Sequence, residues 1–73
     1  MLKINARIKK LRIDNKLTQK QMAQILNIRE ASFQRFEYGT GRPSLDSLLI
    51  IADYFNVSLD YLVGRTDNPE MNK

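Results

Sequence analysis

Residues 17–39 of the chain, LTQKQMAQILNIREASFQRFEYG, contain two short amphipathic segments separated by only a few residues. Thr18 is a favourable N-cap, and Gln21 stands where it would complete a capping box. Asn27 is one of the few non-glycine residues that tolerates the left-handed conformation at the end of a helix. The pattern predicts a helix that starts at Thr18 and a sharp turn at Asn27.

A second helix is expected over about residues 29–38, with Gly39 as its C-terminal stop. Phe33 and Phe36 are predicted to point inward. Successive residues of a helix are rotated by about 100°, so the sequence also indicates which residues lie on the side opposite the two phenylalanines. It carries Glu30, Ala31, Gln34, Arg35 and Tyr38. This outer face is polar and chemically varied.

The flanking sequence also reads as helical. Apolar residues at helical spacing predict a helix over about residues 3–15. Ser44 is suited to cap a fourth helix and Ser58 a fifth, which Gly64 would end. The chain is therefore predicted to be all-α with five helices.

The expected domain covers residues 1–65. Residues 66–73 are polar and contain a proline, so we expect them to form a flexible tail.

The composition argues against an enzyme. No cysteine and no histidine occur, which excludes disulfides, thiolate metal sites, cysteine nucleophiles and the usual general base. Asp46 and Asp60 follow the capping serines, where a negative charge favours a helix N-terminus. No glycine-rich phosphate loop or metal-ligand spacing is present. We therefore expect no catalytic activity, no cofactor and no metal, and no small-molecule ligand is evident from the sequence.

The N-terminal sequence lacks the apolar core of a secretory signal. The longest apolar run, LLIIA at residues 48–52, is far shorter than the roughly 20 residues that cross a bilayer. A soluble, cytoplasmic protein without membrane association is expected.

Charge is distributed unevenly along the chain. Residues 1–42 hold ten Lys and Arg against three acidic residues, a net charge of +7, whereas residues 43–73 carry a net charge of −3. Such asymmetry is typical of a surface that faces a polyanion. A solvated basic face is the alternative interpretation.

Two helices joined by a tight turn, the second with a small polar face, have the geometry that enters the DNA major groove, which is about 12 Å wide. Arg35 is suited to donate two hydrogen bonds to guanine, and Gln34 suits adenine. Glu30 either accepts a hydrogen bond from cytosine or offsets the helix dipole. Ala31 is suited to contact a thymine methyl group.

The sequence resembles the Cro/C1-type helix-turn-helix domain, or XRE family, of phage and bacterial repressors. The resemblance covers residues 4–64 and rests on LTQKQMAQIL, FQRFEYG and RPSLDSLLIIADYFNVSLDYLVG. It implies a compact five-helix lambda-repressor-like DNA-binding domain, with the helix-turn-helix at helices two and three. It also implies a transcriptional regulator.

The resemblance assigns roles to individual residues. Base-reading positions match Glu30, Ala31 and Arg35. Positions along the phosphate backbone match Tyr38, Thr40 and Arg42, and Gln19 matches one that contacts phosphate or orients the recognition helix. Arg12 and Glu37 match an ion pair between the first and third helices.

Two positions depart from the family pattern. Arg29 stands where the family usually has a capping Ser or Thr, so it either contacts phosphate or is a solvated surface residue. The family commonly has a small polar or basic residue at the position of Tyr38. Either the hydroxyl of Tyr38 reaches phosphate or its ring packs on the loop.

Ile50 and Tyr54, together with Tyr61, either pack locally or form a homodimer patch. The favoured hypothesis is a repressor that binds a pseudo-palindromic operator as a homodimer. The alternative is a protein-interaction module that keeps the fold, including an antitoxin bound to a toxin.

Overall fold

The computed structural model describes residues 3–70, which form five helices and no strand, as the sequence predicted. The helices are α1 (Ile4–Asp14), α2 (Gln19–Leu26), α3 (Glu30–Tyr38), α4 (Leu45–Phe55) and α5 (Leu59–Leu62). Within these residues, no helix is both long enough and apolar enough to cross a membrane.

The predicted helix boundaries are set by local side-chain chemistry. The hydroxyl of Thr18 accepts a hydrogen bond from the amide of Gln21, and the side chain of Gln21 accepts one from the amide of Thr18. This reciprocal pair is the expected capping box at the start of α2. The hydroxyls of Ser44 and Ser58 likewise accept hydrogen bonds from the amides of Ser47 and Tyr61, which caps α4 and α5. Asn27 adopts the left-handed conformation with φ 56°, which ends α2.

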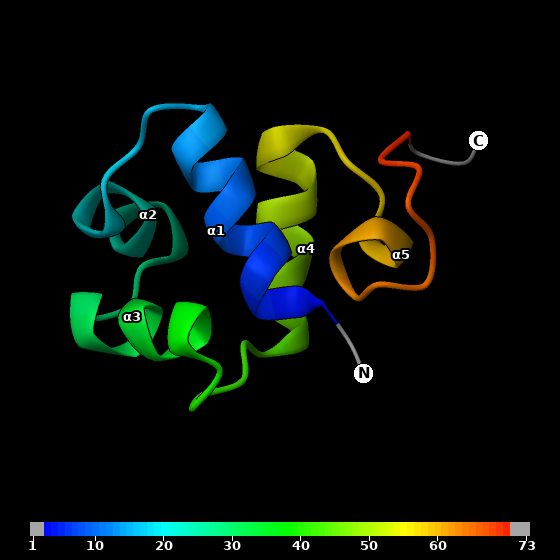
Figure 1. Cartoon of the computed structure of the whole chain (residues 1–73). Helices are drawn as coiled ribbons and strands as arrows, with labels where there is room; N and C mark the ends of the chain where they lie inside the picture. Colours follow the sequence, from blue (N-terminus) through cyan, green and yellow to red (C-terminus); the bar gives the residue numbers. More distant parts are fainter. Residues whose placement is uncertain (1–2, 71–73) are drawn as a thin grey trace.

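The helices form two groups around α1. Helix α3 packs against both α1 and α2, α5 packs against α1 and α4, and α2 also contacts α4. Figure 1 shows the α2–α3 pair on one side of α1 and the α4–α5 pair on the other. Because α3 is held by two helices, its remaining side faces outward.

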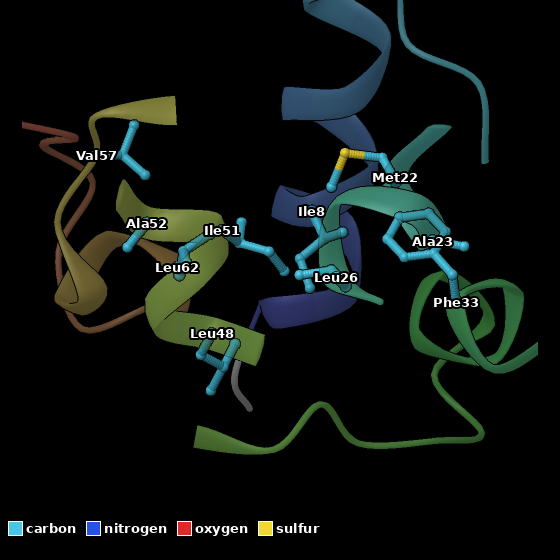
Figure 2. Close-up of a cluster of buried hydrophobic side chains, with 10 residues drawn as sticks. All are labelled: Ile8, Met22, Ala23, Leu26, Phe33, Leu48, Ile51, Ala52, Val57 and Leu62. Carbon is cyan, nitrogen blue, oxygen red and sulfur yellow. The ribbon is translucent and has the colours of Figure 1, made fainter. Parts of the chain in front are cut away.

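The core lies where these helices meet, and each helix contributes to it. Phe33, Ile8, Met22, Ile51 and Leu62 have the largest fully buried side chains. Figure 2 shows Ile51 pointing from α4 toward Ile8 of α1, with Phe33 on the α3 side. The core therefore joins the helix-turn-helix to the rest of the chain by packing.

Phe36 and Phe55 are only partly buried and pack against this core. The sequence predicted Phe36 to point inward, and this contact agrees with that prediction.

The segment that follows α5 is bonded back to the helices. Arg7 of α1, which is buried, donates hydrogen bonds to the carbonyls of Tyr61 and Thr66 and to the carboxylate of Asp67. The amide of Ser58 donates to the carbonyl of Pro69 at 2.8 Å. Residues 66–70 of the expected flexible tail thus make specific contacts with the domain, and residues 71–73 lie outside the described residues.

Asp67 gives this segment a predictable pH dependence. The hydrogen bond from Arg7, together with the nearby Lys3, lowers the pKa of the Asp67 carboxyl below its usual value. A carboxyl whose pKa is lowered by folding stabilises the folded state above its unfolded pKa and loses this effect as it is protonated. We expect Asp67→Asn to lower the melting temperature at pH 7, and the difference from the unmodified chain to shrink as the pH falls below about 4. Thermal unfolding at several pH values checks this, and a pH-independent difference would contradict it.

Candidate nucleic-acid interface

An ion pair between α1 and α3 fixes the position of the outward helix. The guanidinium of Arg12 donates from Nε to Glu37 Oε2 at 2.6 Å and from Nη2 to Glu37 Oε1 at 3.1 Å. The Glu37 side chain is only 3% exposed and that of Arg12 14%. Arg12 also donates to the carbonyl of Leu17, just before α2. The predicted pair is therefore present, bidentate and buried, and it ties α1 to the start of α2 as well as to α3.

Gln19 belongs to the same network. Its side-chain amide donates to Glu37 Oε1 at 3.0 Å, which bridges the first residue of α2 to α3. This contact between α2 and α3 is consistent with one of the two roles that the resemblance implied, and the phosphate contact stays a prediction. Gln19 is half-buried, so its side chain also remains partly accessible from the surface.

The face of α3 that points away from the core carries the predicted base-reading residues. Glu30, Ala31, Arg35 and Tyr38 are exposed, and Gln34 is half-buried. Arg29 is the N-cap residue of α3, makes no side-chain capping hydrogen bond and is exposed. The structure thus places the predicted base-reading residues together on one side of one helix.

The loop after α3 is attached to the last turn of that helix. The amides of Gly39, Thr40 and Gly41 all donate to the carbonyl of Arg35, at 3.0 to 3.2 Å. Gly39 adopts φ 82°, a conformation that favours glycine. Thr40 and Arg42 are exposed, so the expected phosphate-contacting residues of the loop lie on the surface beside the C-terminal end of α3.

The arginines of the described residues fall into two groups, those that form an ion pair and those that do not. Arg7, Arg12 and Arg65 each pair with a carboxylate. Within residues 3–70, Arg29, Arg35 and Arg42 form no ion pair, and all three are exposed. The unpaired arginines are those at the start of α3, on its outer face and in the loop that follows it.

Only two of the three residues of the expected dimer patch are exposed. Ile50 and Tyr54 are exposed on α4, as anticipated. Tyr61 is half-buried, and the Arg7 guanidinium lies over its ring at 4.1 Å from the centroid, so local packing accounts for this residue. Leu45 and Leu49 of α4 are also exposed and were not singled out from the sequence. Eight of the eleven residues of α4 are apolar, so the pattern alone did not distinguish the exposed Leu45 and Leu49 from the buried residues.

Residues 3–70 contain no group of three or more acidic side chains close enough to hold a metal ion. The surface formed by α3 and the loop that follows it carries exposed arginines and polar side chains.

Comparison with known proteins places this arrangement in a family. The model of a family described as "Helix-turn-helix" matches residues 8–62, which is more than half of the chain. The uncharacterized HTH-type transcriptional regulator YobD of Bacillus subtilis is 39% identical over 64 residues, covering 88% of this chain and 57% of that protein. The cryptic phage CTXphi transcriptional repressor RstR of Vibrio cholerae is 38% identical, with the same coverage.

The chain is also similar to a solved structure of a protein bound to DNA. The crystal structure of Bacillus thuringiensis PlcR in complex with the peptide PapR7 and DNA matches with a TM-score of 0.72 and 32% identity. The match covers 82% of this chain and 21% of PlcR. The chain therefore spans little more than half the length of YobD and of RstR, and a smaller part of the length of PlcR. It belongs to the helix-turn-helix family, in the Cro/C1-type (XRE) class that occurs in transcriptional regulators.

Proposed function

We propose that the chain binds double-stranded DNA in a sequence-specific manner and acts as a repressor. In this proposal α3 enters the major groove, where Glu30, Ala31, Gln34 and Arg35 face the base edges. Residues beside α3 hold the phosphate backbone. These are Gln19, Arg29, Tyr38, Thr40 and Arg42.

The observation that carries the proposal is the position of the unpaired arginines. Arg29, Arg35 and Arg42 lie along α3 and its following loop without a carboxylate partner in the described part of the chain. Holding unpaired cations together on one surface is unfavourable unless a polyanion neutralises them, and DNA is such a polyanion. The buried Arg12–Glu37 pair adds support, because a recognition helix must be held in a fixed orientation to read bases.

In vitro selection tests this function directly. The purified chain is incubated with a random duplex library, and the bound pool is sequenced over several rounds. We expect enrichment of inverted half-sites whose centres lie about 34 Å apart, which is one helical turn of DNA. Failure to enrich any sequence would contradict the proposal and favour a protein-interaction module, such as an antitoxin, that keeps this fold.

Salt dependence gives an independent prediction. Affinity for DNA falls by about 0.9 log units per neutralised phosphate for each log unit of salt. If Arg29 and Arg42 each neutralise one phosphate in both protomers, raising the salt concentration fourfold lowers affinity by roughly a hundredfold. Fluorescence anisotropy of the selected duplex at several salt concentrations measures this slope. A flat response would argue against contact with the DNA backbone.

We further propose that the DNA-bound form is a homodimer. A single module of this kind buries only about 600 to 1,000 Å² on DNA, so two modules on a pseudo-palindrome are needed for tight binding. The exposed apolar side chains of α4 support a contact between protomers; they are Leu45, Leu49, Ile50 and Tyr54. Analytical ultracentrifugation of the chain with and without a two-half-site duplex tests this stoichiometry.

A further inference from the structure

A pocket of about 530 Å³ lies behind the loop that follows α3. Its apolar lining comes from elements far apart in the sequence: Ile4 of α1, Phe36 of α3, Leu48 of α4 and Val63 after α5. In Figure 1 the connection between α3 and α4 runs past the N-terminal end of α1. The pocket is lined by Ile4 and Asn5 at that end of α1. Its volume falls within the roughly 300 to 1,000 Å³ that is typical of small-molecule sites.

One wall of the pocket is the loop backbone itself. Gly39 and Gly41 both line the pocket, and neither presents a side chain to it. A Cβ on Gly41 would lie 3.0 Å from the Cβ of Arg35, so this part of the loop is packed directly on the last turn of α3. A molecule in the pocket would therefore contact the segment that connects Arg35 to Arg42.

Polar groups occur at two points of the lining. Within the described residues, Arg42 is the one charged side chain there, and it forms no ion pair in residues 3–70. The Asn5 amide lies on the α1 side, with its Nδ2 atom 3.4 Å from the place of a Cβ on Gly39. A pocket that is open to solvent on one side, with a mainly apolar lining and one cation, suits a ligand that has an apolar body and one anionic group, because a guanidinium matches the two oxygens of a carboxylate.

We propose that this pocket binds a small, mainly apolar carboxylic acid, whose carboxylate pairs with Arg42 and whose body lies against Ile4, Phe36 and Leu48. Such a ligand could not be predicted from the sequence, because the lining residues are scattered along the chain. Ligand binding at this site does not depend on any interaction with DNA.

The position of Arg42 also gives the site a regulatory effect, which rests on the proposed function. A carboxylate paired with the Arg42 guanidinium neutralises its charge and repels a DNA phosphate that approaches it. The ligand therefore lowers the affinity for DNA, and DNA lowers the affinity for the ligand by the same factor.

The first test uses the chain alone. Three probes are titrated into ¹⁵N-labelled protein: octanoate, 3-phenylpropionate and indole-3-acetate. The amide of 3-phenylpropionate serves as the matched neutral control. We expect saturable shifts of the amide signals of Asn5, Phe36, Gly39, Gly41 and Val63 with at least one acid, and much weaker binding of the neutral amide. No saturable shifts with any acid, or equal binding of the neutral amide, would overturn the proposal.

Two variants locate the carboxylate. Arg42→Gln is expected to weaken binding of the acid by about tenfold or more, the loss typical of a hydrogen bond to a charged group. Arg65→Gln removes the same charge from an exposed arginine that does not line the pocket, so binding is expected to be unchanged. Equal effects of the two substitutions would overturn the pairing with Arg42.

A DNA readout then tests the regulatory effect separately. Binding of the selected duplex is measured with and without the acid, in the unmodified chain and in Val63→Phe, which fills part of the pocket with a larger side chain. We expect the acid to weaken DNA binding in the unmodified chain and to lose this effect in Val63→Phe. If the acid binds but leaves DNA affinity unchanged, the site stands and the competition is wrong. If the chain binds no DNA at all, the shifts of the first test still decide whether the pocket holds the acid.

Discussion

Replacing Glu37 by alanine is expected to lower the free energy of unfolding by about 3 to 5 kcal/mol. The substitution leaves the guanidinium of Arg12, whose side chain is 14% exposed, without its carboxylate and removes the acceptor of the Gln19 amide. A small domain has a total stability of only about 5 to 15 kcal/mol, so much of it would be lost. Urea denaturation followed by circular dichroism measures the change.

Two further variants distinguish the effect of breaking the buried ion pair from the effect of removing a surface charge. Asp14→Ala removes the same charge from an exposed pair with Lys10, whose atoms lie 2.7 Å apart, and is expected to cost less than about 1 kcal/mol. The double variant Arg12→Met with Glu37→Leu removes both buried charges and is expected to recover most of the stability. A loss in Glu37→Ala no larger than that in Asp14→Ala would show that the buried pair does not hold α1 to α3.

Replacing Arg35 by alanine is expected to abolish discrimination at one base pair in each half-site of the operator. A bidentate contact to guanine gives about 1 to 3 kcal/mol of discrimination, and a dimer makes this contact twice. The preference for the selected site over one mutated at both positions should then fall by a factor between about 30 and 10⁴. Repeating the selection with the variant identifies the base pair, and anisotropy titrations give the factor.

Arg65→Ala is the matched control for this experiment. It removes the same charge from an exposed arginine beside Asp60, outside the proposed interface. Non-specific attraction to DNA should fall by a similar amount in both variants, whereas base preference should change only in Arg35→Ala. An unchanged base preference in Arg35→Ala would remove this residue from the reading set.

Local chemistry explains why much of the fold could be predicted from the sequence. The cap of α2 depends on Thr18 and Gln21, three positions apart, and the left-handed turn depends on Asn27 alone. Such signals lie within one turn of helix, so they are visible in the sequence. The outer face of α3 follows from helical periodicity in the same way, and this placed its polar residues together.

Contacts between distant segments could not be predicted from the residues alone. The Gln19–Glu37 hydrogen bond joins positions 18 residues apart, and the bonds from Arg7 reach Thr66 and Asp67, 59 and 60 residues further on. The Arg12–Glu37 pair was expected only through the family resemblance. Periodicity gives the side of a helix on which a residue lies but does not identify its partner on another helix, which depends on the packing of the whole chain.

The bonds made by residues 66–70 determine where a recombinant fragment of this domain can end. Cutting the chain after residue 65, where the sequence suggested the domain boundary, would remove the Thr66 and Asp67 acceptors of the buried Arg7 guanidinium. It would also leave the Ser58 amide at the start of α5 without the Pro69 carbonyl. Each buried polar group left without a partner costs about 1 to 3 kcal/mol. A fragment for crystallisation or for fusion to a reporter should therefore extend at least through Pro69.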